Sequence, residues 1–350
     1  MPTTTHNRSW TCPTASTPDD RVQLAHGEGG RLMRKLLNER ILPILGVSSH
    51  EDAALVDYAG SILAVTTDSF VVSPLFFPGG DIGCLAVYGT LNDLAVAGAQ
   101  PLCLTLSLII EEGFSLELLE RILTSAAVAA KAAHTPIVAG DTKVVPRGAA
   151  DGLFINTSGV GRYRGATPLA SHSIKVGDVL IASGPIGQHG IAVMVARENL
   201  QLQPAPFSDC APLVDACRSI QQALGSDLHA MRDATRGGVS AVMHEWAESC
   251  GATMHLVESQ IPVASETRGA CELLGLDPLA VANEGTFIAA VAPQAAELAL
   301  EALRQCPVSA AAQVIGRVVE PLAFPVVIER LFSRLQPLDE PSGAQLPRIC

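Results

Sequence analysis

The chain has 350 residues, of which 48% are hydrophobic and 17% are charged, and its formal net charge is -12. This length allows a sizeable core and favours two domains over one. The acidic excess argues against a nucleic-acid-binding protein, because neutralising phosphates requires basic patches. No apolar run reaches the length of a membrane span, so we expect neither nucleic acid nor a membrane as a partner.

The nine cysteines are scattered along the chain without a CxxC pair, and residues 1–30 contain no apolar segment for export. Their odd number and this polar beginning predict a reduced, cytoplasmic protein. Most of the cysteines are expected to be small buried hydrophobes. Cys84 and Cys271 are accordingly expected to carry no chemistry.

The first part of the chain predicts an α/β domain over residues 31–165, after an N-terminal extension over residues 1–30 that lacks periodicity and is predicted to be disordered. Helices are predicted over residues 31–42, 82–97 and 115–133. Strands are predicted over residues 61–67, 102–110, 136–139 and 153–160, and a loop over residues 74–80. Ser115 is a favourable cap for the third of these helices.

Strand and helix signals begin again after a boundary at residues 162–176, which predicts a second α/β domain over residues 166–332. Strands are predicted over residues 178–182, 254–257, 286–291, 314–319 and 325–328. Helices are predicted after the turn at residues 183–187 and over residues 211–224, 237–249 and 294–304. Residues 201–209 are predicted to be a loop, and residues 273–282 are mixed.

The last stretch, residues 333–350, is predicted to be a flexible tail, because residues 336–345 are rich in Pro, Gly and polar side chains. The tail ends in Cys350, whose thiol has nothing after it to pack. A thiol on a mobile arm suits a group that is carried between sites. On chemistry alone, an accidental cysteine on a frayed terminus explains it equally well.

Four aspartates of the first half, Asp52, Asp68, Asp93 and Asp141, share one kind of setting, and Asp68 and Asp141 are predicted to follow strands directly. Hard oxygen ligands at strand ends are what Mg²⁺ with a polyphosphate requires. For any single one of them, a helix cap or an Asx turn remains the alternative.

The second half contains two glycine-rich turns at predicted helix starts, residues 183–190 and 233–239. Either turn can present backbone N–H groups to an anion. Neither matches a P-loop or a GxGxxG fingerprint, and ordinary tight turns explain them equally well.

Four segments, taken together and in this order, resemble a known superfamily. They are residues 66–70 (TTDSF), 92–99 (NDLAVAGA), 140–145 (GDTKVV) and 233–238 (DATRGG). They are similar to the superfamily of aminoimidazole ribonucleotide synthetase, selenophosphate synthetase and thiamine-monophosphate kinase. Residues 74–80 (PLFFPGG), 271–277 (CELLGLD), 282–285 (ANEG) and 347–350 (PRIC) resemble its HypE family of hydrogenase maturation proteins. The resemblance covers residue 31 to the end.

This resemblance implies a two-domain, PurM-like α/β fold with a flexible tail, paired into a homodimer through the N-terminal halves, with ATP near that interface. It also implies an ATP-dependent carbamoyl dehydratase that acts on its own C-terminal cysteine. The thiol would receive a carbamoyl group from the partner HypF, and dehydration would leave a thiocyanate. The cyano group would then pass to the iron of a HypC–HypD complex, on the route to NiFe hydrogenase.

By resemblance, Cys350 carries the group, and Glu284 and Lys143 are the candidate proton acceptors. A lysine acts as a base only when its pKa is lowered, so Glu284 is expected to accept the proton while Lys143 relays it or holds phosphate. The residues expected at the nucleotide are Asp52, Asp68, Asn92, Asp93, Gly140, Asp141, Thr142, Gly187, Asp233, Gly237 and Gly238. The expected Mg²⁺ ligands are Asp52, Asp68, Asp93 and Asp141.

Two alternatives stay open: a small-molecule kinase or synthetase of the same superfamily, and a non-catalytic maturation scaffold. The terminal cysteine discriminates against the first, and the aspartate set discriminates against the second. His189 and His244 are interpreted as structural, because no second ligand lies at a spacing that would close a metal site.

Overall fold

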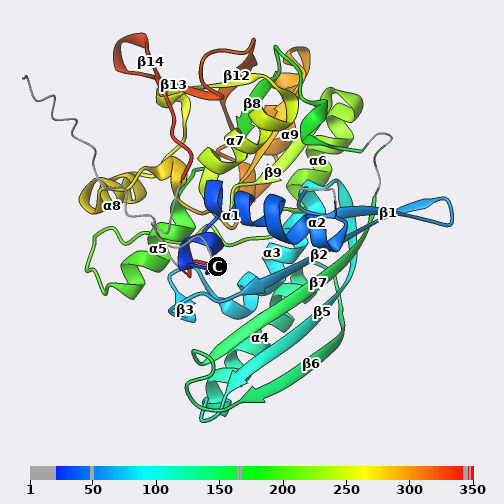
Figure 1. The fold of residues 1–350 in the computed structure, drawn as a ribbon, viewed down its shortest axis with the longest axis vertical. Helices are drawn as coiled ribbons and strands as arrows, with labels where there is room; N and C mark the ends of the chain where they lie inside the picture. Colours follow the sequence, from blue (N-terminus) through cyan, green and yellow to red (C-terminus); the bar gives the residue numbers. More distant parts are fainter. Residues whose placement is uncertain (1–20, 48–50, 164, 166–167, 342–345, 347) are drawn as a thin grey trace, which may run out of the picture.

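The computed structural model describes residues 21–47, 51–163, 165, 168–341, 346 and 348–350 (Figure 1). Its first half is a five-stranded sheet in the order β1-β2-β7-β5-β6. The strands are β1 (Ala54–Tyr58), β2 (Ser61–Phe70), β5 (Ala99–Glu111), β6 (Ile137–Val145) and β7 (Leu153–Tyr163). All neighbours are antiparallel except β5 and β6, which are parallel.

Helices α3 (Ile82–Val96) and α4 (Leu116–Ala132) cover one face of this sheet (Figure 1). The predictions for both helices are confirmed. α3 begins where the Asp81 carboxylate accepts hydrogen bonds from the backbone N–H groups of Gly83 and Cys84, at 2.7 and 3.2 Å. α4 is amphipathic and buries only the stripe formed by Ile122, Ala126, Ala129 and Ala130.

The second half is a seven-stranded sheet in the order β14-β13-β10-β12-β8-β11-β9. Its strands are β8 (Val179–Ala182), β9 (Leu228–Asp233), β10 (Thr253–Val257), β11 (Phe287–Val291), β12 (Gln313–Val319), β13 (Val326–Arg330) and β14 (Arg334–Pro337). Its helices are α5 (Gln188–Arg197), α6 (Val214–Leu224), α7 (Gly238–Cys250), α8 (Ser265–Leu274) and α9 (Ala296–Arg304). The layering of helices on both sheets confirms the α/β class.

The second sheet is covered on both faces, which explains why β11 is buried along its whole length. One core packs around α7 and includes the fully buried Trp246, and the other packs around α6 and α9. Short helical turns connect these elements: η3 (Ser171–Ser173), η4 (Gly225–Asp227), η5 (Glu258–Gln260), η6 (Pro278–Ala280), η7 (Pro293–Ala295), η8 (Pro307–Ser309) and η9 (Leu331–Ser333).

The N-terminal helix differs from its prediction. η1 (Leu24–Gly27) precedes α1 (Gly30–Leu36), which continues through the π-helical turn η2 (Leu37–Ile41) into α2 (Leu42–Leu45). Pro43 does not stop the helix: it lies directly after the π-helical turn, near the start of α2. The predicted disordered extension is therefore too long: residues 24–30 are structured, and residues 1–20 lie outside the described residues.

Several strands differ from the sequence-based expectations. Residues 74–80, predicted to be a loop, contain the small hairpin of β3 (Phe76–Phe77) and β4 (Gly80–Asp81). β6 does not end at Gly140 but continues to Val145, because parallel pairing with β5 satisfies its backbone groups. β1, β9, β14 and α8 were not predicted at all.

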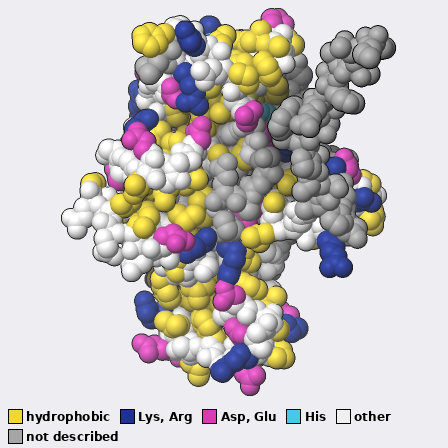
Figure 2. Space-filling view, turned by 60° about the vertical axis from the view of Figure 1, so that its left-hand side comes forward, with side chains coloured by type: hydrophobic (Ala, Val, Ile, Leu, Met, Phe, Trp, Pro, Cys, Tyr) yellow, Lys and Arg dark blue, Asp and Glu magenta, His cyan; other side chains and the backbone are white. Residues whose placement is uncertain are grey.

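Within the ranges that the structure describes, no helix combines the length and the apolarity that crossing a membrane requires. Figure 2 shows one face of the molecule, on which Lys and Arg side chains are scattered among Asp, Glu and hydrophobic ones.

Candidate active site

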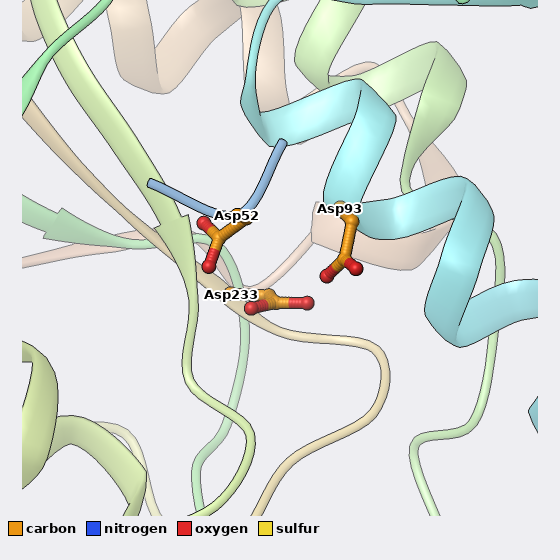
Figure 3. Close-up of side chains that lie close together, drawn as sticks. All are labelled: Asp52, Asp93 and Asp233. Atoms are coloured by element: carbon orange, nitrogen blue, oxygen red, sulfur yellow. The ribbon is translucent and has the colours of Figure 1, made fainter. Parts of the chain in front are cut away.

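Three buried or half-buried aspartates form a cluster between the two halves of the chain. The ligand atoms of Asp52, Asp93 and Asp233 all lie within 4.8 Å of one another. In Figure 3 their carboxylates point toward one another from the segment before β1, from α3 and from the end of β9. Three elements far apart in sequence therefore build one acidic site.

Burial and mutual repulsion disfavour the ionised forms of the three carboxylates. Burial, followed by the charges of neighbouring carboxylates, raises the pKa values of Asp52 and Asp93 well above the usual range. Burial also raises the pKa of Asp233, to about 6. Arg232 lies 3.2 Å from Asp52 and opposes this shift there. A divalent cation with oxygen ligands fits this donor set and would stabilise all three ionised forms.

The predicted ligand set is only partly brought together. Asp68 lies beside the cluster, 3.9 Å from Arg236, and its charge helps to raise the pKa of Asp93. Asp141 does not join it: this side chain is exposed on β6 and pairs with Lys143. Asp233, predicted only as a nucleotide contact, takes the third position. Asp233 ends β9, a strand that is not predicted from the sequence, so this aspartate was not recognised as lying at a strand end.

Cys350 lies inside the protein rather than on a free arm. The backbone N–H of Val71 donates to the Cys350 carbonyl at 3.0 Å, and that of Ser73 donates to the Arg348 carbonyl at 3.2 Å, as in an added antiparallel strand. Arg197 donates to the same Arg348 carbonyl at 2.7 Å. Residues 342–345 and 347 of the predicted tail lie outside the described residues, but its described end is docked and buried.

The charges of Glu284 and Arg236 act on the docked thiol. Burial is the main cause that raises the pKa of Cys350, Arg236 opposes it, and the charges of Glu284 and Asp68 add to it. The Glu284 carboxyl is buried at 3% exposure, and burial together with Asp233 and Asp68 raises its pKa well above the usual range. The structure thus brings the predicted thiol and the predicted proton acceptor to one buried site, beside the aspartate cluster.

Lys143 is not at this site in a single chain. Its Nζ contacts the two carboxylate oxygens of Asp141 at 2.8 and 2.6 Å, and both side chains are exposed on β6. Thr142 is exposed on the same strand. Gly140 has a packing role, because a Cβ there would lie 2.2 Å from the Leu106 carbonyl of β5. Asp141, Thr142 and Lys143 are thus exposed on β6 and apart from the aspartate cluster of the same chain.

Asn92 is also used structurally. Its Nδ2 donates to the carbonyls of Ala211 and Glu284, both at 3.1 Å, and its Oδ1 accepts from the backbone N–H of Leu213 at 2.8 Å. These bonds occupy both amide protons and the amide oxygen. Asn92 therefore joins α3 to the Glu284 loop.

The predicted glycine turns do begin helices. Gly187 precedes α5, and its N–H donates to Asn283 Oδ1 at 2.7 Å. Gly237 precedes α7 and lines a cavity of about 20 Å³ together with Arg236 and Ile349. Gly238 has a positive φ of 59°, and a Cβ there would lie 2.6 Å from two carbonyl oxygens, so no other residue fits. The second turn therefore lies at the docked tail.

The N-terminal segment contacts the tail from the other side. Arg31 N–H donates to the Pro341 carbonyl at 3.1 Å, and Arg34 makes two hydrogen bonds of 2.8 Å to the Glu340 carboxylate. Arg236 donates to the Gly27 carbonyl at 3.3 Å. The predicted helix at residues 31–42 thus contacts the tail through Arg31 and Arg34, and the predicted extension contributes the Gly27 carbonyl.

The histidines and cysteines that were predicted to be structural differ in their surroundings. His244 contacts the Ser240 carbonyl in its own helix, at 2.8 Å. His189 contacts the carbonyl of Ile349 and so touches the tail. Burial raises the pKa of the Cys271 thiol to about 11, whereas a hydrogen bond from Cys210 lowers that of Cys84 to about 7.

Comparison with known proteins gives consistent matches over both halves. Residues 50–163 match the N-terminal domain, and residues 175–327 the C-terminal domain, of AIR synthase related proteins. The chain is 45% identical to the carbamoyl dehydratase HypE of Escherichia coli (strain K12), over 95% of this chain and 100% of that protein.

Two solved structures are similar over most of the chain. The crystal structure of a HypE–HypF complex contains a chain with 42% identity and a TM-score of 0.83, covering 87% of this chain and 99% of that one. The crystal structure of a HypE in complex with ATP has 40% identity and a TM-score of 0.80, covering 94% and 100%.

Proposed function

The chain belongs to the AIR synthase related family and, within it, to the HypE carbamoyl dehydratases of hydrogenase maturation, and from this membership we propose that it dehydrates an S-carbamoyl group on its own Cys350 to a thiocyanate. The observation that carries the proposal is the position of the Cys350 thiol, buried beside Glu284 and Arg236 and next to the aspartate cluster. An ATP-dependent dehydration needs the thiol, a proton acceptor and a cation site at one place.

The proposed reaction converts R–S–C(=O)NH₂ and ATP into R–S–C≡N, ADP, phosphate and one proton. ATP supplies the phosphoryl group that turns the carboxamide oxygen, a poor leaving group, into phosphate. Asp52, Asp93 and Asp233, with Asp68 beside them, are proposed to hold Mg²⁺ and through it the polyphosphate. Arg236 adds a positive charge beside the thiol.

The chain itself must take the protons from the carboxamide nitrogen. Glu284 is proposed to accept them, because its pKa is raised by burial and a general base works best when its pKa approaches the working pH. A cation at the aspartate cluster would hold Glu284 ionised by opposing the neighbouring negative charges. Glu284 therefore has the position and the environment of a proton acceptor.

Replacing Asp93 by asparagine is expected to weaken Mg·ATP binding by at least tenfold, because it removes one charge from the trio while keeping the shape. Isothermal titration calorimetry measures this affinity directly. Asp215→Asn is the matched control, because Asp215 lies exposed on α6 and pairs with Arg218. Unchanged affinity in the Asp93 variant would remove this carboxylate from the nucleotide site.

A homodimer through the first sheet is proposed to complete the site. β6 is an edge strand with Val138 and Val144 exposed at 60% and 68%, and β5 exposes Ile109 at 44%. Exposed apolar edge strands are normally covered. Val138 and Val144 lie on one side of the β6 strand, and Asp141 and Lys143 lie on the other, with Ile109 of β5. A second copy along the β6 edge would contact both sides, and Asp141 and Lys143 are proposed to serve the partner's nucleotide there.

Replacing Val144 by glutamate is expected to dissociate this dimer and to lower ATP-dependent dehydration by at least tenfold, because a buried charge would face the partner strand. Sedimentation velocity at micromolar concentration measures the association. Val176→Glu, at an exposed valine outside the first sheet, is the control. A wild-type chain that sediments as a monomer would contradict the interfacial site.

HypF is the proposed carbamoyl donor, since a structurally similar chain was solved in a HypE–HypF complex. A HypC–HypD complex is the proposed acceptor of the cyano group. The described cysteines are all free, which agrees with a proposed cytoplasmic location.

Mass spectrometry of the intact chain tests the proposed reaction. After incubation with the carbamoylating partner, the chain is expected to gain one carbamoyl group, and addition of Mg·ATP is expected to remove one water from the adduct. A kinase of small molecules would leave the mass of the chain unchanged. A scaffold would gain no adduct that responds to ATP.

A further inference from the structure

His189, at the second position of α5, is fully buried beside the docked tail. Its Nε2 lies 2.9 Å from the Ile349 carbonyl oxygen, and its Nδ1 lies 2.8 Å from Ser208 Oγ. The imidazole ring of His189 and the ring of Phe77 pack edge to face, with centroids 5.2 Å apart and an interplanar angle of 88°. The imidazole therefore contacts the residue that directly precedes Cys350.

The direction of these hydrogen bonds is determined by the chemistry of the partners. A carbonyl oxygen only accepts, so Nε2 of His189 carries the proton and donates to Ile349. Burial lowers the pKa of His189 to about 4, which keeps the ring neutral, so Nδ1 accepts from the Ser208 hydroxyl. Ser208 Oγ in turn accepts from the backbone N–H of Cys210 at 3.1 Å. Each polar atom of the imidazole thus has one definite partner.

Asp209, which follows Ser208 in the chain, holds the loop that contains Glu284. One carboxylate oxygen of Asp209 accepts from the backbone N–H of Glu284 at 3.1 Å. The other accepts from the N–H of Gly285 at 3.0 Å and from the hydroxyl of Thr286 at 3.1 Å. Two adjacent side chains, those of Ser208 and Asp209, therefore lead to the tail on one side and to the proposed proton acceptor on the other.

We propose that His189, Ser208 and Asp209 form a positioning unit that holds the carbamoylated thiol of Cys350 in register with Glu284. This inference rests on the proposed function. The three residues act through the Ile349 carbonyl and the backbone of Glu284, and so they position the reacting groups rather than react themselves.

Loss of this positioning unit is expected to affect carbamoylation and dehydration of Cys350 in opposite directions. Proton transfer to Glu284 needs the carboxamide within hydrogen-bond reach, and a small displacement slows such a step strongly. Loss of His189 leaves the buried Ile349 carbonyl without its donor, which favours the undocked tail. An undocked thiol is more accessible to a carbamoyl donor. A role in folding alone would instead impair both steps together.

The test uses the full chain with His189→Leu and His189→Gln. His189→Leu is expected to slow single-turnover dehydration of the carbamoylated chain at least tenfold, while carbamoylation by the HypF-type partner stays equal or becomes faster. Alkylation of Cys350 by iodoacetamide, followed on the C-terminal peptide by mass spectrometry, is expected to become about tenfold faster. His189→Gln keeps an N–H donor and is expected to restore most of both rates.

His244→Leu is the matched control, because His244 is also a buried helical histidine, and its Nδ1 contacts the Ser240 carbonyl of its own helix. It is expected to leave Cys350 alkylation unchanged. Equal dehydration and alkylation rates in His189→Leu and wild type would overturn the proposal, as would a parallel loss of both steps with a lowered melting temperature in the glutamine variant.

Asp209→Asn tests the link between the positioning unit and Glu284. It is expected to slow dehydration, because an amide cannot accept from both backbone N–H groups, yet to leave the alkylation of Cys350 unchanged. Faster alkylation in this variant would contradict the separate roles of His189 at the tail and Asp209 at Glu284. If wild type itself gains no carbamoyl group or loses no water, the proposed function fails, whereas the alkylation assay still decides whether His189 holds the tail.

Discussion

A Cys350→Ala chain is expected to bind Mg·ATP like wild type but to accept no carbamoyl group and to form no thiocyanate. The thiol is the only atom at the docked terminus that carries the proposed substrate, and alanine keeps the backbone that Val71 holds. The aspartate cluster keeps its three carboxylates in this variant. Calorimetry measures nucleotide affinity, and intact-mass spectrometry measures both chemical steps.

Cys271→Ala is the matched control for this variant. Cys271 is also buried and its pKa is also raised by burial, but it lies on α8 and contacts the hydrophobic core. It is expected to be carbamoylated at Cys350 and dehydrated normally. If the Cys350→Ala chain still gained the mass of a carbamoyl group, another thiol would be the acceptor, and the proposed reaction would be contradicted.

The second large effect is expected from Glu284→Gln, which should lower the dehydration rate by about 10²- to 10⁴-fold, the range typical of a lost general base. The amide has nearly the same shape, and the bonds that Asp209 and Asn92 make to residue 284 involve only its backbone. Carbamoylation should therefore proceed normally, and the adduct should accumulate. Single-turnover mass spectrometry after ATP addition gives the rate.

Glu272→Gln, on an exposed position of α8, is the control for a carboxylate lost elsewhere. It is expected to dehydrate the adduct at the wild-type rate. If Glu284→Gln also dehydrates at that rate, the proton acceptor is another group, and Lys143 of a second copy becomes the candidate. A combined Lys143→Ala and Glu284→Gln chain would then decide between the two.

The sequence by itself determined the elements whose signals are local. Ser115 caps α4, which buries an apolar stripe at helical spacing, and the long apolar run after Asp81 gives α3. It also determined, through four short motifs and the terminal cysteine, the resemblance to the HypE family. These signals act within a few residues, so they can be read without knowing what the chain contacts.

The course of β6 depended on a partner strand. Gly and Asp are rare in strands, so the sequence predicts an end at Gly140 and an aspartate at a strand end. In the structure β5 pairs with the whole of β6, and Gly140 allows the close approach to Leu106. Asp141 therefore lies within an exposed strand and away from the acidic cluster.

The site itself was decided only by the tertiary structure. The tail composition predicts mobility, yet Ile349 is bound by His189, which lies 160 positions away, and Arg348 by the carbonyl of Val71, 277 positions away. Asp52, Asp93 and Asp233 likewise meet from three separate elements. Local patterns specify periodicity and caps, but the burial that raises pKa values and docks a terminus arises only when distant segments pack together.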